Sequence, residues 1–318
     1  MGITKNRQSP ETLQALCRAA YPGRAVAAIT ELTEGMFNAA YRIDFADGGA
    51  SVLKIAAADA KGLMSNEINL MQAEVAAMDI VRKHGLPLVP RVEYADFTHK
   101  ACSGSFFFME CLPGQSMNSC RDTLSETEQA HVMTQVGAFQ RQLAGIHNEG
   151  FGLLGDPQRF PTLHGLIRRL FEHVLRDAAA VPLDLGLTEA EVLRRLDADE
   201  AAFAEVKTAS LVHWDMWEGN IFVRDGELCG VIDWERAMWG DPLMDDRFRS
   251  HNRPAAFLAA FGQQDFSAAE RRRLAWYDLF LYITMSAEGF YREYEDTAGL
   301  LGWLRPMLDA AWAEICTG

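Results

Sequence analysis

Two kinds of hydrophobic pattern divide the chain. In the first third, short apolar runs with partial alternation are separated by turns rich in Gly, Pro, Asn and Asp, a pattern typical of strands. These runs predict the five strands of an antiparallel sheet, at residues 25–29, 39–45, 50–55, 92–94 and 105–109. Apolar residues at spacings of three and four predict two helices in the same third, at residues 10–21 and 65–84.

Helical spacing dominates the rest of the chain. Capping boxes at residues 125–128 and 188–191 mark two helix starts, because a Ser or Thr and the Glu three residues later satisfy free backbone N–H groups. The predicted helices follow Ser125, cover residues 161–176 and 188–206, and fill most of the chain from Ala268 onward. A sheet followed by helices predicts an α+β fold.

One segment within the helical part has a β pattern instead. Residues 209–212, 221–223 and 228–232 are apolar runs, and the last two flank a turn at Asp225-Gly226. The segment therefore predicts a strand, a polar loop and a β-hairpin. A tight hairpin would return its far end to the loop that precedes it.

The polar residues of this segment would then share one small site. Asp215 and Asn220 lie in the loop, and Asp233 ends the hairpin. Phosphoryl transfer from ATP needs this set: a carboxylate to orient the attacking hydroxyl and accept its proton, and oxygen ligands to hold Mg²⁺ on the phosphates. The alternative is that turns simply favour Asp and Asn, which explains Asp225 better than three polar residues at the ends of apolar strands.

The spacing H-x-D-x-x-x-x-N at residues 213–220, followed by a hydrophobic strand and I-D, resembles the catalytic and metal loops of the aminoglycoside phosphotransferase family, a branch of the protein-kinase-like fold. The resemblance implies that Asp215 is the catalytic base and that Asn220 and Asp233 bind Mg²⁺. The family usually has Gly between the His and the Asp, where this chain has Trp214.

The same resemblance implies two lobes. An N-lobe, residues 1–110, would hold the antiparallel sheet and bind the nucleotide. A mainly helical C-lobe, residues 111–318, would be catalytic and bind the acceptor. Within the C-lobe, residues 240–245 resemble the family's G-D-P-x-x-D segment, whose second Asp, here Asp245, braces the catalytic loop.

Lys54 lies in an otherwise apolar run, where a charged side chain is costly to bury without a partner. The resemblance implies that it binds the α- and β-phosphates of ATP and pairs with a Glu on the following helix. Glu67 and Glu74 are both available, and the distance from Glu74 to Val89-Pro90 fits the family spacing better. The alternative is a lysine on an edge strand whose side chain reaches water.

The turn at residues 34–38 resembles the family's nucleotide-covering loop, in which small and polar residues let backbone N–H groups approach the phosphates. Gly35 and Asn38 are the candidate contacts. The alternative is an ordinary hairpin turn, because Gly and Asn favour turns anyway.

Residues 109–114 resemble the hinge between the lobes. This position implies that the Glu110 carbonyl and the Leu112 N–H bind adenine and that Met109 lines the pocket. The alternative is a surface turn at Pro113-Gly114 after a core strand.

Composition predicts the cellular compartment and disfavours some kinds of partner. The chain has no run of eighteen apolar residues and no apolar signal region, which predicts a cytoplasmic protein without a membrane partner. Six scattered cysteines without a C-x-x-C pair fit reduced thiols. Of the net charge of −14, residues 1–110 hold 11 Lys+Arg against 12 Asp+Glu, so residues 111–318 hold 19 against 32, a net of −13. This acidity disfavours nucleic acid as a partner.

The acidic C-lobe also bears on the acceptor. Because acceptors in similar families bind against the C-lobe, we expect one that is cationic or at least not anionic. Candidate contacts are Glu288, Glu293, Glu295 and Asp296, although a solvated helix face is the simpler explanation of these four. Acidity that serves solubility alone is the alternative.

Together these features predict an ATP- and Mg²⁺-dependent kinase that phosphorylates a hydroxyl group of a small molecule, with an antibiotic as the first expectation. Metabolic acceptors of the homoserine, choline, fructosamine or nucleoside type are alternatives. A non-catalytic ATP-binding module is a further alternative, and the intact set Lys54, Asp215, Asn220 and Asp233 argues against it. The sequence leaves the oligomeric state open.

Overall fold

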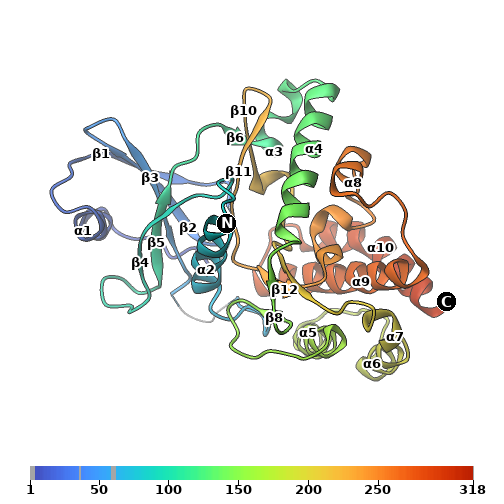
Figure 1. Cartoon of the computed structure of the whole chain (residues 1–318). Coiled ribbons are helices and arrows are strands. Elements are labelled where there is room, and N and C mark those ends of the chain that lie inside the picture. The colour runs from blue at the N-terminus through green and yellow to red at the C-terminus, as the bar shows by residue number, and fades with distance from the viewer. Residues whose placement is uncertain (1–3, 36, 59–61, 318) are drawn as a thin grey trace.

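The fold divides into a sheet region and a larger helical region, as Figure 1 shows for the computed structural model. The structure describes residues 4–35, 37–58 and 62–317. Among these residues, no helix combines the length and the apolar character that a membrane span requires. The predicted α+β fold is confirmed by this arrangement.

The sheet region is antiparallel throughout and has the strand order β1-β2-β3-β5-β4. All five expected strands are present, and the first and fourth extend further than expected. The order places the strand with Lys54 in the centre of the sheet, so the edge-strand alternative for this lysine is wrong. The strands are β1 (Val26–Leu32), β2 (Ala39–Phe45), β3 (Ala50–Ile55), β4 (Val92–Asp96) and β5 (Phe106–Glu110).

Two helices, α1 (Pro10–Ala20) and α2 (Leu70–Lys83), cover the sheet. Leu53 and Ile55 of β3 belong to the same hydrophobic cluster as the buried side of α1. Because successive side chains of a strand point to opposite faces, Lys54 projects from the other face, toward α2.

The helix α2 begins at Leu70, so the expected start at residue 65 is wrong. Asn69 adopts a left-handed conformation with φ of 47°, and its side-chain amide donates to the Gly155 carbonyl at 3.0 Å. The contact fixes a bend immediately before the helix. Glu67 therefore lies on a non-helical segment that runs along the helical region rather than on the face of α2.

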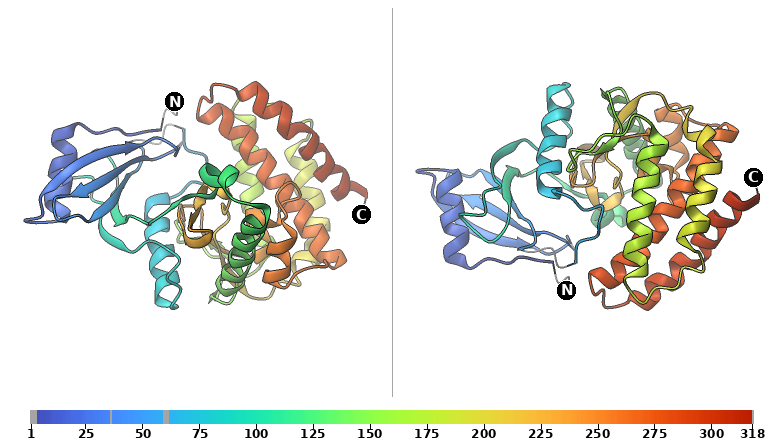
Figure 2. Two further views of the ribbon diagram at one scale, coloured as in Figure 1. Left: turned by 90° about the horizontal axis from the view of Figure 1, so that it is seen from above. Right: turned by 90° about the horizontal axis from the view of Figure 1, so that it is seen from below.

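The helical region contains short helices that were not expected, and one expected helix is divided. The expected helix at residues 188–206 is divided at Asp199, whose carboxylate accepts a hydrogen bond from the Trp276 indole at 2.8 Å. In Figure 2 the long helices α9 and α10 lie side by side at the end of the molecule away from the sheet. The helices are α3 (Met117–Cys120), α4 (Glu126–Leu143), α5 (Leu163–Ala179), α6 (Glu189–Ala198), α7 (Glu200–Phe203), α8 (Ala255–Phe261), α9 (Ala268–Tyr291) and α10 (Thr297–Thr317).

Short strands flank the loop that holds Asp215 and Asn220. The expected hairpin is present as β10 and β11, and its turn residues Asp225 and Gly226 both have positive φ, as a tight two-residue hairpin turn requires. β6 pairs with β10, and β9 lies between β7 and β12. The strands are β6 (Gln115–Ser116), β7 (His147–Asn148), β8 (Gly152–Leu153), β9 (Ala209–Val212), β10 (Ile221–Arg224), β11 (Glu227–Val231) and β12 (Met238–Gly240). Four short 3-10 helices complete the list: η1 (Arg121–Thr123), η2 (Glu218–Asn220), η3 (Pro242–Met244) and η4 (Asp246–Phe248).

Candidate active site

The loop between β9 and β10 is braced by His213. The ring Nε2 lies 2.9 Å from the Ile232 carbonyl, and the Asp215 N–H donates to Nδ1 at 3.2 Å. These two contacts require an imidazole that is protonated on Nε2 alone. Burial lowers the pKa of His213 to about 4, which keeps the ring in this neutral form. The loop and the end of the hairpin are thereby joined.

Asp215 and Asn220 face each other across the loop. The Asn220 side-chain amide donates to the Asp215 carbonyl at 2.8 Å and lies 3.4 Å from the Asp215 carboxylate. This contact uses the amide nitrogen, so the amide oxygen is the atom that Asn220 has to offer a cation. Burial raises the pKa of Asp215 well above its ordinary value, Arg236 opposes that rise, and neighbouring carboxylates, Asp233 first, add to it.

Lys54 joins the sheet to the end of the hairpin. Its ammonium donates to Glu74 at 2.7 Å and to Asp233 at 2.6 Å. The structure therefore pairs Lys54 with Glu74, as expected, and places Glu67 elsewhere. Burial lowers the pKa of Lys54, but the surrounding carboxylates outweigh that effect and hold the net value above the ordinary one.

Glu235 is a site residue that the sequence analysis missed. Its carboxylate lies 3.9 Å from the Lys54 ammonium and accepts a hydrogen bond from the Asn38 amide at 2.6 Å. Ligand oxygens of Glu74, Asp233 and Glu235 all lie within 4.8 Å of one another. In the sequence Glu235 is only a second acid two residues after Asp233, next to Arg236, and nothing there marks it as a site residue.

This cluster fits a divalent cation. Three carboxylates surround one ammonium, an excess of two negative charges if all are ionised. Burial raises the pKa of Glu235 to about 8 and that of Glu74 to about 7, which shows how poorly the buried charges are balanced. Carboxylate oxygens are the ligands that Mg²⁺ prefers.

Residues 28–277 match the phosphotransferase enzyme family. The chain belongs to this family. Its membership confirms the predicted family and the prediction of an enzyme that transfers phosphoryl groups. No curated protein sequence matches the chain.

Solved structures with a similar fold align with nearly the whole length of this phosphotransferase. The apo form of a thermostable mutant of aminoglycoside phosphotransferase APH(4)-Ia has a TM-score of 0.64 and 21% identity, covering 92% of this chain and 96% of that chain. A ternary complex of such a mutant with AMP-PNP and hygromycin B has a TM-score of 0.69 and 20% identity, covering 96% and 99%. A structure from Thermobifida fusca YX-ER1, provisionally assigned as a fructosamine-3-kinase, has a TM-score of 0.68 and 18% identity, covering 96% and 100%. These likenesses confirm the predicted two-lobe kinase-like fold.

Trp214 of this phosphotransferase occupies a backbone position that suits glycine. Its φ is 76°, in the left-handed region that side chains with a Cβ disfavour, and its N–H donates to Asp245 at 3.0 Å. Trp214 therefore has a backbone conformation that glycine adopts without strain. The indole is buried against Phe280, at 6.2 Å between ring centroids, and the Arg236 guanidinium lies over it at 5.1 Å.

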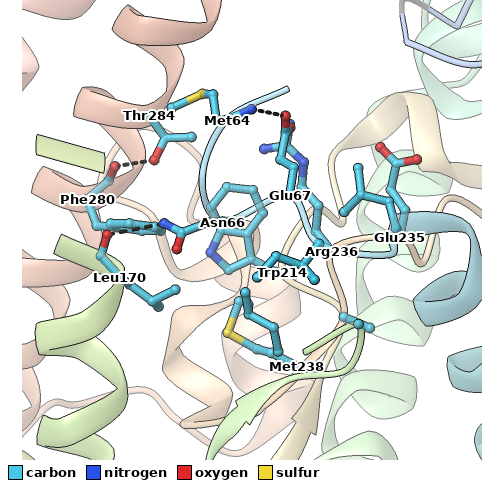
Figure 3. Close-up of a pocket in the computed structure, with 15 residues that line it drawn as sticks. Met64, Asn66, Glu67, Leu170, Trp214, Glu235, Arg236, Met238, Phe280 and Thr284 are labelled. Atoms are coloured by element: carbon cyan, nitrogen blue, oxygen red, sulfur yellow. Dashed lines mark hydrogen bonds and ion pairs between the residues drawn. The ribbon is translucent and has the colours of Figure 1, made fainter. Parts of the chain in front are cut away.

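Beside Trp214 lies a pocket of about 50 Å³ between the segment before α2 and the helices α5 and α9 (Figure 3). Its polar side chains are already bonded: the Asn66 amide donates to the Leu170 carbonyl at 3.1 Å, and the Thr284 hydroxyl donates to the Phe280 carbonyl at 2.8 Å. The pocket consequently presents an apolar wall behind the catalytic loop. Its other lining residues are Met64, Glu67, Ile68, Leu70, Leu153, Gly155, Glu235, Arg236, Ala237 and Met238.

The turn at residues 34–38, predicted to cover the nucleotide, holds its two candidate contacts in different environments. Gly35 is exposed, and a Cβ there would meet no atom within 4 Å among the described residues, so packing does not require glycine at this position. Met36 lies outside the described residues. Asn38 is buried, and its side-chain oxygen has no hydrogen-bond partner among the described residues. An unsatisfied buried acceptor of this kind is free to receive a donor.

At the hinge, Met109 is buried and Glu110 is the last residue of β5. Leu112 lies against β11, since a Cβ at Gly230 would come within 2.4 Å of it. Gly114, with φ of 94°, leads directly into β6, which pairs with the catalytic hairpin. Pro113 and Gly114 are exposed, as the surface-turn alternative expects, and the chain then joins the hairpin through β6.

Glu288 was expected to contact the acceptor, and the structure contradicts this expectation. Glu288 is buried, and its carboxylate is paired with Arg236 and, at 3.4 Å, with Arg292. Its charge is already balanced within the protein, so it does not form part of a free acidic surface on α9.

Proposed function

We propose that this phosphotransferase transfers the γ-phosphoryl group of ATP, with Mg²⁺, to a hydroxyl group of a small molecule, and that an antibiotic is the natural acceptor. The convergence of Asp215, Asn220 and Asp233 with Lys54 carries the proposal. Lys54 lies on β3, 179 residues before Asp233, so turn preferences alone do not account for their meeting in space.

Asp215 takes the role of the base. Among the described residues its carboxylate has one side-chain contact, with Asn220 at 3.4 Å, and pairs with no cation, so it is available to an incoming hydroxyl. As the hydroxyl oxygen forms a bond to the γ-phosphorus, its proton passes to the Asp215 carboxylate, and the bond between the γ-phosphorus and the bridging oxygen breaks to release ADP. The raised pKa of Asp215 brings it closer to that of a useful proton acceptor at neutral pH.

The nucleotide would lie between the proposed N-lobe, residues 1–110, and C-lobe, residues 111–318. Lys54, held by Glu74, would contact the phosphates, with Gly35 and Asn38 covering them. Met109, Glu110 and Leu112 would line the adenine site. Asn220 and Asp233 would hold Mg²⁺, and Glu235 is placed to join them. When bound, the ion would neutralise the phosphates and orient them.

Antibiotic acceptors are favoured by the similar fold of APH(4)-Ia, which has been solved with hygromycin B, and by the acidic balance after residue 110. Metabolic acceptors are the second candidate, because the fold of the Thermobifida fusca structure, provisionally a fructosamine-3-kinase, is as similar. A non-catalytic ATP-binding module would have no need for the base and both metal ligands together.

The experiment is an acceptor panel assayed for phosphoryl transfer from ATP by mass spectrometry, with and without Mg²⁺. The panel holds aminoglycosides, fructosamines, choline, homoserine and nucleosides. We expect Mg²⁺-dependent addition of one phosphoryl group to an aminoglycoside. Transfer to a metabolite alone would overturn the antibiotic assignment, and ATP binding without transfer to any compound would favour the non-catalytic module.

A further inference from the structure

Four charged side chains form a buried cluster between the two regions of the fold. The members, which we call the interlobe ion cluster, are Glu67, Arg236, Glu288 and Arg292. Arg236 contacts Glu67 at 3.1 Å and also pairs with Glu288, while Arg292 pairs with Glu67 and lies 3.4 Å from Glu288. Two cations and two anions alternate, so the cluster is balanced in charge. Glu67 comes from the segment before α2, and Arg292 from the end of α9.

The nucleotide-covering turn rests on this cluster. The Phe37 ring lies over the Arg292 guanidinium, at 4.1 Å from the guanidinium carbon to the ring centroid. On its other side the Phe37 carbonyl accepts a hydrogen bond from the Thr4 hydroxyl at 2.8 Å. The next residue, Asn38, is bonded to Glu235. Consecutive residues of one turn are thus anchored to the end of α9 and to the carboxylate cluster.

Arg292 is suited to this position by its own chemistry. Its side chain is 2% exposed, and a desolvated guanidinium over an aromatic face is a stronger contact than an exposed one. The planar group stacks on Phe37 while its edge binds carboxylates, which a lysine ammonium does not reproduce. Its Nε is buried without a partner among the described residues, so the stack and the ion pairs account for its fixed orientation.

We propose that Arg292 is a positioning residue for nucleotide binding, which acts through Phe37 to hold the nucleotide-covering turn over the phosphate site. This inference rests on the proposed function. A turn that is already fixed loses less conformational freedom when ATP binds, so the contact raises affinity without touching the nucleotide. Because Arg292 also binds Glu67, the turn is held in place only when the two regions are closed on each other.

The kinetic test uses Phe37→Leu, which removes the aromatic face and leaves the ion cluster whole. We expect KM for ATP to rise about 3- to 10-fold, the range that a buried cation–π contact supports, with KM for the acceptor and the melting temperature unchanged. Phe37→Tyr keeps the aromatic face, so its KM for ATP should lie much closer to the wild-type value than that of Phe37→Leu. Phe97→Leu is the matched control, since Phe97 is an exposed aromatic of the same region.

A double-variant comparison identifies Arg292 as the partner. Arg292→Met should raise KM for ATP at least as much as Phe37→Leu, and adding Phe37→Leu to it should have no further effect. Arg292→Lys should recover little of the loss. Additive effects of the two changes, or an unchanged KM for ATP in Phe37→Leu, would overturn the proposal.

A measurement without turnover separates this inference from the proposed function. Amide hydrogen exchange of residues 33–38 without nucleotide should be faster in Phe37→Leu and Arg292→Met than in wild type or Phe97→Leu, by about the same factor as the change in KM. Equal exchange in all four proteins would overturn the role of Arg292 even for an active kinase. Faster exchange in a protein that phosphorylates no acceptor would uphold the contact and refute the proposed function.

Discussion

The proposed catalytic loop and the turn proposed to cover the nucleotide are held by contacts of different range. In the loop, Asn220 bonds to Asp215 and the Trp214 N–H bonds to Asp245, all within one segment of the chain. The turn instead depends on Glu235, which is 197 residues from Asn38, and on Arg292 near the end of the chain. Contacts within one segment require residues at a fixed spacing, which can be recognised in the sequence. Contacts between distant segments leave no such spacing.

The difference predicts how each region responds to change. The loop should keep its backbone path as long as its own hydrogen bonds remain, among them the bond from the Trp214 N–H to Asp245. The turn should respond to changes anywhere along the surface between the two regions. Lys54 connects the two regions, because its ammonium binds Glu74 of the sheet region and Asp233 at the end of the hairpin.

The largest expected effect comes from removing Lys54. Lys54→Met would leave Glu74, Asp233 and Glu235 buried together without their shared cation, and loss of one partner from a buried ion pair costs about 3–5 kcal/mol of stability. Urea unfolding of the variant measures this loss. Lys83→Met, at an exposed lysine paired only with Asp79, should change stability by less than about 0.5 kcal/mol. Equal stability of the two variants would show that the cluster is not held by charge.

A second effect concerns His213, which braces the loop. Its pKa is about 4 in the folded protein, below its ordinary value of 6.5. Between these values the unfolded chain binds a proton at His213 that the folded protein does not, so the contribution of His213 to stability falls by about 3 kcal/mol as pH drops from about 6.5 toward about 4. Glu74 and Glu235, whose pKa values are raised, act in the opposite direction but are common to wild type and His213→Gln. Urea unfolding of both proteins across this range should therefore show wild type losing stability relative to His213→Gln as pH falls. The same slope in both proteins would remove His213 as its source.

The proposed metal ligands should differ in strength. Asp233→Ala removes a charge and a ligand, whereas Asn220→Ala removes only a neutral ligand, so we expect Mg²⁺-dependent nucleotide affinity to fall roughly 10- to 100-fold in the first and clearly less in the second. Nucleotide titrations with and without Mg²⁺ measure both. An Asp233→Ala protein with an unchanged Mg²⁺ dependence would rule out this residue as a ligand.

The smallest expected effect concerns the acceptor. The net of −13 after residue 110 attracts a cationic acceptor, and such attraction is screened beyond about 8–10 Å at physiological salt. KM for the acceptor should therefore rise a few-fold as salt increases, and more than KM for ATP. An acceptor that is neutral or anionic, with a KM independent of salt, would show that the acidity serves solubility.

The contrast between local and distant contacts also explains what the sequence predicted. Strand alternation and the Asp225-Gly226 turn predicted the sheet and the hairpin, because each depends on neighbouring residues. The need to pair a lysine within an apolar strand predicted an acidic partner, and the family spacing selected Glu74 over Glu67. The start of α2 was missed because Asn69 is fixed by Gly155, a contact that no local pattern records.

The parts of the site that were missed have the same cause. Glu235 lies in a segment where one more acid carries no distinct signal, and its importance comes from Asn38 and Lys54, both from the sheet region. Glu288 was expected as an exposed acidic contact, although Arg236 and Arg292 neutralise it. Only the folded chain brings these partners together.

Transfer of labelled phosphate from ATP to an acceptor, measured for wild type and for Asp215→Asn, tests the central claim most directly. Asp225→Asn, in the exposed hairpin turn, is the matched control. We expect Asp215→Asn to bind ATP normally and to transfer phosphate about 10²- to 10⁴-fold more slowly, while the control matches wild type. Transfer by Asp215→Asn at the rate of wild type would contradict the assignment of this carboxylate as the base.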